Sequence, residues 1–374
     1  YGQALSRQGK PSESRTVLAS FAKVFPKSTL LPESQLAIAR THVMDGSWVS
    51  SIIEYDRWVT NYPAHPALPQ AEFDCAWLNH QAGNRVRAFQ LFTNYVVQFP
   101  TNRLAPVAQK WIADHQFQSG KFAEAEQGYR RLFENTNLLA NARGLEWEAR
   151  LNAGRSAFFR QEHAAAELLL ASVINATNAP VAEQARAEFF LGDVVADQTQ
   201  RTPMNLFDAL PHYQRVANEM IGSPLHPLAW GRVGDCYLQL GNLDPAADAY
   251  RAVTELPGTD VTTRSQAGLG LARVLEEQAA LAGETEEREE LLQQSLYQCM
   301  KIVFGDNLRS AREKMDPFWV KEAGLMAGHL AGRLGRADQE RSVYSRLAKE
   351  LPDMPLWQAK LDALKVGPES PKAP

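Results

Sequence analysis

The sequence predicts an all-α fold, a right-handed superhelical solenoid of about eight helix hairpins, from three series of turn residues, the paired helical segments between them and the chain length. With 374 residues, the chain exceeds the roughly 250–300 residues at which a single hydrophobic core stops growing. It must therefore divide into domains or extend as a repeat. The turn residues recur with a spacing of 37 residues: an aromatic-Pro pair at Phe25-Pro26, Tyr62-Pro63 and Phe99-Pro100; a proline at Pro32, Pro69 and Pro106; and a glycine at Gly9, Gly46, Gly83 and Gly120.

Two segments of helical length lie between these markers in each unit. The segments 69–82 and 86–99 both carry apolar residues at spacings of three and four, as an amphipathic helix requires. Gly83 lies between them, where a helix ends and a positive φ is useful. The aromatic-Pro pair ends the second segment, because proline disfavours helical geometry in the residue before it. Each unit is therefore predicted to be a helix hairpin.

Two further series predict how the hairpins stack, since one hairpin cannot bury its own apolar stripe. Small residues recur in the first helices and should let neighbouring helices approach closely, whereas aromatic residues recur in the second helices and should fill the space between hairpins. The small residues are Ala39, Ala76 and Ala113, and the aromatic residues are Tyr55, Phe92, Tyr129, Tyr250 and Tyr344.

The regularity of the repeat divides the chain into four segments. Residues 1–135 hold the regular 37-residue repeats and begin with a remnant over 1–26, and residues 136–225 hold divergent hairpins with extra residues near 199–206. Residues 226–355 hold the C-terminal repeats, with an acidic insertion near 280–290. Residues 356–374 are expected to be a tail, Pro-rich from Gly367 on. Tyr1 is not a methionine and lies part-way through a repeat, so we expect further sequence before it.

One hairpin carries a nearly complete family signature. It resembles a tetratricopeptide repeat (TPR) in the residues Trp230, Gly234, Tyr237, Gly241, Ala246, Tyr250 and Pro257. The 37-residue unit with its aromatic-Pro ending is similar to the longer TPRs of bacterial envelope proteins, namely the Tol-Pal-associated and outer-membrane assembly types. The TPR resemblance covers about 1–355 and the envelope resemblance about 20–135. The first implies protein binding, and the second implies the periplasm or envelope of a Gram-negative bacterium, with the cytoplasm as the alternative.

The repeat register also predicts a partner-binding groove on the first helices. The residues on this face mix cations with aromatic side chains, as a groove for an extended peptide or a partner helix would. The alternative is a solvated wall with no dedicated ligand. The predicted groove residues are Arg40, Met44, Phe73, Trp77, His80, Lys110, Asp114 and Phe117.

Composition and motifs argue against several other functions. The formal net charge of −4 disfavours general nucleic-acid binding, and no apolar run approaches the roughly 20 residues of a membrane-spanning helix. We find no phosphate loop, nucleophile elbow or metal-ligand spacing, so no catalytic residue, cofactor or metal is expected. Cys75, Cys236 and Cys299 lie far apart in the sequence and are expected to be packed inside helices.

The sequence therefore predicts a non-catalytic scaffold that binds a protein or peptide partner in the first-helix groove. Two alternatives stay open: the repeats are the recognition arm of a larger polypeptide, or they assemble with copies of themselves. The sequence does not determine the oligomeric state or the identity of the partner.

Overall fold

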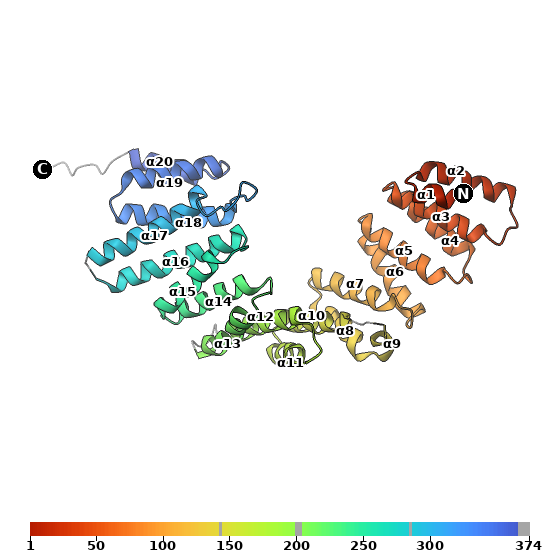
Figure 1. The fold of residues 1–374 in the computed structure, drawn as a ribbon, viewed down its shortest axis with the longest axis horizontal. Helices are drawn as coiled ribbons and strands as arrows, with labels where there is room; N and C mark the ends of the chain where they lie inside the picture. Colours follow the sequence, from red (N-terminus) through yellow and green to blue (C-terminus); the bar gives the residue numbers. More distant parts are fainter. Residues whose placement is uncertain (142–143, 199–203, 284–285, 366–374) are drawn as a thin grey trace. The chain divides into compact units, whose positions relative to one another are not determined.

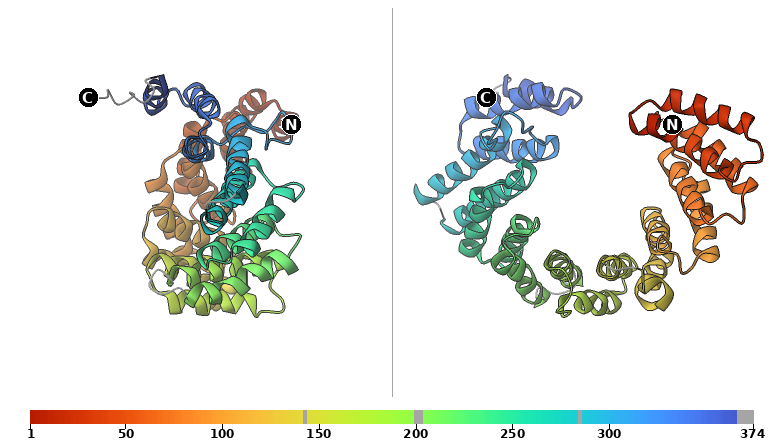
Figure 2. Two further views of the ribbon diagram at one scale, coloured as in Figure 1. Left: turned by 90° about the vertical axis from the view of Figure 1, so that its left-hand side faces the viewer. Right: turned by 45° about the vertical axis from the view of Figure 1, so that its right-hand side comes forward.

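The computed structural model describes residues 1–141, 144–198, 204–283 and 286–365, and within these ranges the regular secondary structure is α-helical (Figure 1). The chain divides into two compact units, Tyr1–Glu183 and Gln184–Pro374, and the boundary falls in the first turn of one helix. Within each unit, neighbouring hairpins pack side by side in chain order (Figures 1 and 2). The predicted all-α repeat fold is confirmed.

Unit 1 contains four complete hairpins, formed by the helix pairs α3–α4, α5–α6, α7–α8 and α10–α11, after the shorter pair α1–α2. The helices are α1 (Gly2–Arg7), α2 (Pro11–Val24), α3 (Leu31–Met44), α4 (Trp48–Asn61), α5 (Leu68–Gln81), α6 (Arg85–Gln98), α7 (Ala105–Gln118), α8 (Phe122–Glu134), α9 (Thr136–Leu139), α10 (Leu145–Phe159) and α11 (His163–Ile174). The predicted helices over 69–82 and 86–99 match α5 and α6 to within one residue.

Unit 2 contains four further hairpins among its described residues, formed by α12–α13, α14–α15, α16–α17 and α18–α19, and a last helix, α20. The helices are α12 (Val181–Gln198), α13 (Met204–Glu219), α14 (His226–Gln239), α15 (Leu243–Glu255), α16 (Val261–Leu281), α17 (Glu286–Phe304), α18 (Pro317–Arg333), α19 (Ala337–Glu350) and α20 (Leu356–Lys365). The predicted number of about eight hairpins therefore agrees with the structure.

The turn residues act as their spacing predicts. Gly9, Gly46, Gly83 and Gly120 all have positive φ, between 68° and 83°, which glycine adopts without strain. A proline in the first turn begins α3, α5 and α7, where its missing N–H is not needed. The turn between α10 and α11 has no glycine, and Gln161 takes the left-handed conformation there with φ 63°. This substitution explains why the repeat is hard to follow in the middle of the sequence.

The packing series are also confirmed. Ala39, Ala76 and Ala113 are completely buried, and the aromatic series of the second helices is at most 3% exposed. The first helices leave room for these rings with small residues: a Cβ atom on Gly234 would lie 2.7 Å from the Tyr250 ring. The three cysteines are buried and unpaired, and burial raises the pKa of each thiol to about 12.

Two expectations about boundaries differ from the structure, and one short helix had not been expected. The segment 356–365 is helix α20 rather than tail, and its Trp357 side chain is completely buried against the end of unit 2. The acidic residues 286–290 form the first turns of α17, where carboxylates interact favourably with the helix dipole, so they do not form an insertion between helices. The short helix α9 was not predicted; the Asn135 side chain caps it. Part of the expected extra segment, 199–203, and the tail beyond 365 lie outside the described residues.

Candidate protein-binding site

The predicted groove residues lie on three first helices of unit 1: α3 carries Arg40 and Met44, α5 carries Phe73, Trp77 and His80, and α7 carries Lys110, Asp114 and Phe117. We call the outward surface of α3, α5, α7 and α10 the first-helix face of unit 1. Arg40, Met44 and Trp77 are exposed on it, and the other five residues are half-buried. The structure therefore exposes three of the eight predicted residues and half-buries the other five.

Trp77 is the largest exposed aromatic side chain on this face. It is 41% exposed although it projects from a well-packed helix. Its ring lies 5.5 Å from the His80 ring, one helical turn further along α5, in an edge-on arrangement. His80 in turn lies edge-on to Trp111 of α7 at 5.3 Å. Trp77 is thus fixed at one end of a continuous aromatic cluster.

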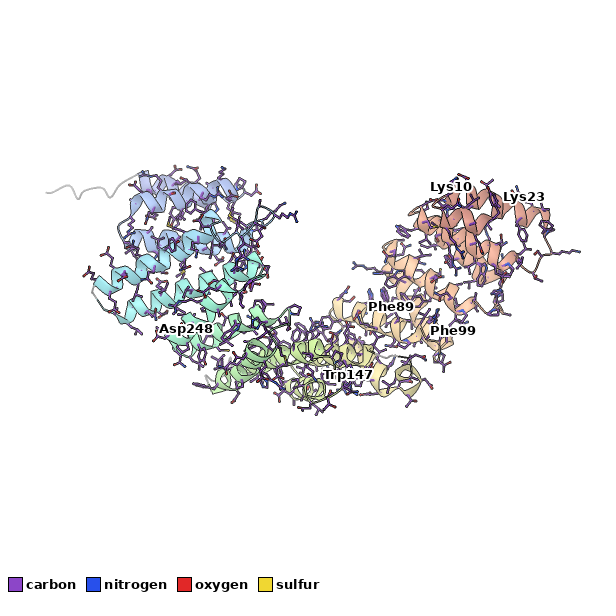
Figure 3. The ribbon with its side chains drawn as sticks, viewed as in Figure 1. Lys10, Lys23, Phe89, Phe99, Trp147 and Asp248 are labelled. Atoms are coloured by element: carbon purple, nitrogen blue, oxygen red, sulfur yellow. The ribbon has the colours of Figure 1, made fainter. Side chains whose placement is uncertain are left out.

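The inner part of this cluster joins two hairpins. The Trp111 ring stacks on His115 at 5.3 Å with an interplanar angle of 3°, and it lies 4.6 Å from the buried ring of Phe92. Phe89 of α6 closes the cluster against His115 at 5.3 Å and lies where α6 meets α7 (Figure 3). Burial, together with the positive charges of Arg85 and Lys121, lowers the pKa of His115, so its imidazole is neutral near pH 7.

The polar part of the face is a salt-bridge network that the sequence only partly indicated. The Lys110 ammonium lies 2.8 Å from Asp114 and 3.2 Å from Glu148 of α10. Burial alone would lower the pKa of Lys110, but its hydrogen bonds to the two carboxylates outweigh burial and raise it. Lys110 is therefore already paired with two carboxylates, which leaves little of its charge for a partner. Glu148 was missed because the α10 repeat has no turn glycine to set the register.

The remaining predicted residues have distinct roles. Phe73 packs edge-on against Phe92 and Tyr95, at about 5.5 Å from each, so it contributes mainly to packing between hairpins. The Met44 side chain is 52% exposed, with its sulfur 3.1 Å from the Ser6 hydroxyl. The Arg40 side chain is exposed on α3.

Phe117 belongs to a second aromatic cluster on the same face. Its ring contacts Phe122 at 5.3 Å and Phe159 at 5.6 Å, and Phe159 is half exposed. The Arg155 guanidinium lies 5.2 Å from the Phe117 ring, a distance at which a cation and an aromatic face attract each other. The first-helix face of unit 1 therefore presents two aromatic surfaces, around Trp77 and Phe159.

A phenol–carboxylate pair recurs beneath the first-helix faces of both units. The tyrosine of the second helix donates its hydroxyl to an aspartate of the first helix at 2.7 Å in the pairs Tyr129–Asp114, Tyr213–Asp193 and Tyr250–Asp235. Burial of the rings and the adjacent carboxylates raise the pKa of these phenols, which stay protonated donors.

The hairpin α5–α6 lacks this phenol–carboxylate pair. Phe92 takes the tyrosine position and has no hydroxyl, and Trp77 takes the aspartate position, six residues before the turn glycine. In this hairpin, therefore, the second helix lacks the phenol, and the first helix carries an exposed indole where the three hairpins with the pair carry a carboxylate.

The described ranges contain neither a membrane-spanning helix nor a cluster of metal-ligating side chains. No helix between residues 1 and 365, the masked positions aside, is long and apolar enough to span a bilayer. Likewise, the described His, Cys, Asp and Glu residues form no group of three or more that could hold a metal ion.

Comparisons with known proteins identify the repeat. A tetratricopeptide repeat family model matches residues 208–260. Among solved structures, the C-terminal part of a TPR repeat-containing protein from Cytophaga hutchinsonii aligns with a TM-score of 0.51 and 11% identity, covering 77% of this chain and 99% of that one. A STAND signal-transduction ATPase with a tetratricopeptide repeat sensor from Pyrococcus horikoshii also aligns with a TM-score of 0.51, at 12% identity, covering 96% of this chain and 54% of that one. The curated proteins contain no match.

The fold and the repeated helix-packing positions define a helical-hairpin repeat protein. Residues 208–260 match the tetratricopeptide repeat family model, and the described helices share the hairpin fold of solved tetratricopeptide-repeat structures.

Proposed function

We propose that this protein is a non-catalytic scaffold that binds a segment of a partner protein on the first-helix face of unit 1. The observation that carries the proposal is Trp77, an indole that is 41% exposed yet held by His80 and the aromatic cluster behind it. Tryptophan is enriched among the residues that dominate binding energy at protein interfaces. An anchor that is already rigid loses little conformational entropy on binding, so its contact area contributes more to affinity.

The chemistry around Trp77 favours a polypeptide partner with mixed character. Arg40 is exposed on the preceding first helix, and the half-exposed ring of Phe159 offers a second apolar contact on α10. A partner segment with apolar side chains and a carboxylate would match these groups. Because Lys110 is already paired with Asp114 and Glu148, we assign it to holding α7 against α10 rather than to the partner.

Affinity capture with cross-linking from the source cells tests the proposal. The wild-type chain is compared with the Trp77→Ala and Arg40→Glu variants. The matched control is Tyr297→Ala, which removes another exposed aromatic ring, 60% exposed, from the second helix α17 of unit 2. A partner retained by the control and lost by both variants, with far-UV circular dichroism unchanged, is the expected result. A partner captured equally by all four proteins would contradict binding through this face.

The same experiment distinguishes the two alternative functions. Recovery of peptides from this chain alone, with a mass that rises with concentration, would favour self-assembly. Covalently continuous peptides from sequence beyond residues 1–374 would favour the recognition arm of a larger polypeptide. The envelope location stays a prediction, for which fractionation of the source cells with compartment markers is the test.

A further inference from the structure

The first-helix side of unit 2 contains a small cavity. Its volume is about 180 Å³, and it lies between α12, α14 and α16. The buried ring of Phe189 and the side chains of Leu228 and Ala267 give it apolar walls, and Arg232, Thr263 and Gln266 are its polar lining residues. A cavity of roughly 150 Å³ with apolar walls can hold a benzene ring. The cavity is therefore large enough for one leucine, methionine or phenylalanine side chain.

The cavity exists because one helical position lacks a side chain. Gly231 stands ten residues before the turn glycine Gly241, the position that Phe73 and Lys110 occupy in the repeats of unit 1. A Cβ atom on Gly231 would meet no atom within 4 Å, so packing does not require glycine here. Gly234 on the same helix is different, because its Cβ would collide with Tyr250. Since glycine in a helix interior is less stable than alanine, Gly231 weakens α14 without relieving any clash, and it leaves the cavity open.

The charged residue that lines the cavity is Arg232, and two carboxylates outside the lining, Asp193 and Asp235, lie next to its guanidinium. Asp193 lies one helical turn after Phe189, and Asp235 lies one turn after Gly231. The guanidinium of Arg232 lies 3.4 Å from Asp193 and 3.5 Å from Asp235. Both distances exceed the roughly 2.7–2.9 Å of a strong charge-assisted hydrogen bond. The Tyr213 hydroxyl and Arg232 share Oδ1 of Asp193, so Oδ2 of this carboxylate accepts no bond from the described residues. A further donor can therefore bind there.

The charge of the whole unit has the same sign as these two carboxylates. Residues 184–374 contain 21 Lys and Arg against 27 Asp and Glu, a net charge of −6. Such a surface attracts cationic segments over long range and repels acidic ones.

We propose that this cavity, which we call the Gly231 pocket, binds an apolar side chain of a basic partner segment, with a neighbouring Lys or Arg of that segment paired to Asp193. The inference rests on the proposed function, since it adds a second point of contact for a polypeptide partner. It specifies the chemistry of that contact: an aliphatic or aromatic residue close to a cation. An acidic segment or a polar side chain is excluded from the pocket.

The test uses the full-length chain and defined fluorescein-labelled peptides in an anisotropy titration. Each peptide has a central Leu and one Lys placed one to four residues away on either side, in a Ser-Gly background. The control peptides replace the Leu with Ser, or the Lys with Glu. Burial of a leucine side chain corresponds to roughly 10- to 100-fold in Kd, so the Ser peptide should bind weaker by about that factor.

Protein variants separate the pocket from other surfaces. Gly231→Leu fills the cavity and should raise the Kd of the Leu-Lys peptide at least about 10-fold. The substitution should not weaken α14, because leucine is a better helix former than glycine. Gly332→Leu is the matched control, a helical glycine of unit 2 whose Cβ would meet no atom closer than 3.6 Å, and it should leave Kd unchanged. Asp193→Asn keeps an acceptor for Tyr213 but removes the charge, so it should weaken the Lys peptides and leave the Leu requirement intact.

Either of two results would overturn the pocket: the Leu-Lys peptides bind Gly231→Leu as tightly as wild type, or no peptide of the set binds wild type at millimolar concentration. Trp77→Ala should not affect this titration, because Trp77 lies in unit 1. Failure of the pocket and failure of the Trp77 anchor are therefore separate outcomes.

Discussion

The hydrogen bond between Tyr129 and Asp114 links the packing of a hairpin to the polar network on its first-helix face. Tyr129 is 2% exposed, and its hydroxyl donates to Asp114 at 2.7 Å. A hydrogen bond to a charged group contributes about 1.5–3 kcal/mol. The Asp114 side chain is 31% exposed and keeps its bond to Lys110, so solvent compensates part of the loss. We expect Tyr129→Phe to lower the free energy of unfolding by about 1 kcal/mol.

Removing the acceptor should lower the free energy of unfolding more than removing the hydroxyl. Asp114→Ala leaves the buried phenol without an acceptor and leaves Lys110 with Glu148 alone, so we expect a loss of about 2 kcal/mol. The double variant should show a coupling energy of about 1 kcal/mol in a double-mutant cycle. The measurement is urea unfolding followed by tryptophan fluorescence, with hydrogen exchange of the α8 amides to localise the effect, because repeat proteins do not always unfold in one step.

The preceding hairpin supplies a control in the same register. Phe92 is completely buried at the position of Tyr129, and its partner position is Trp77 rather than an aspartate. Phe92→Tyr adds a hydroxyl without a carboxylate to accept its proton, so it should destabilise the hairpin by about 1–2 kcal/mol. The reasoning would be refuted if Tyr129→Phe had no effect and Phe92→Tyr stabilised the protein.

Three further predictions concern packing, the thiols and a loop of unit 2. Gly234→Ala places a Cβ atom 2.7 Å from the Tyr250 ring, so thermal unfolding should show a loss of about 1–3 kcal/mol. The three thiols are buried, and burial raises the pKa of each to about 12. Iodoacetamide at pH 8 should therefore label them only after unfolding. Rapid labelling of the native chain would contradict this packing. Arg264 is 4% exposed and donates to the backbone oxygen of Asn307, so Arg264→Ala should speed limited proteolysis between residues 305 and 316; an unchanged cleavage rate there would argue against this anchoring role.

Most of the fold could be predicted from the sequence because its turn residues recur at a constant spacing. A glycine at positive φ and a proline in a first turn are required by the local backbone conformation. They can therefore be recognised without knowing which helices pack nearby. Where the turn uses Gln161 instead of glycine, the register was lost, and with it the contribution of Glu148. The helix that carries Trp357 was missed although Trp357, Leu361 and Leu364 recur at spacings of four and three, because this short segment follows the last hairpin and adjoins the Pro-rich tail.

The candidate site was harder to predict than the fold. Position in the repeat assigned eight residues to the first-helix face, of which Trp77, Arg40 and Met44 are exposed and the other five are half-buried. It could not show that Lys110 pairs with two carboxylates, since one of them comes from the next hairpin. It also could not show the Gly231 pocket, because a cavity reflects the absence of a side chain among three helices rather than a residue that a motif would contain.

Photo-crosslinking from single positions tests the central claim most directly. A photoreactive amino acid is placed at Gln81, exposed at the end of α5 beside the Trp77 surface, and in a separate protein at Val86, which is 74% exposed on the second helix of the same hairpin. We predict partner adducts from position 81 that disappear with Trp77→Ala, and none from position 86. Adducts from position 86 alone would place the partner on the second helices and contradict binding through the first-helix face of unit 1.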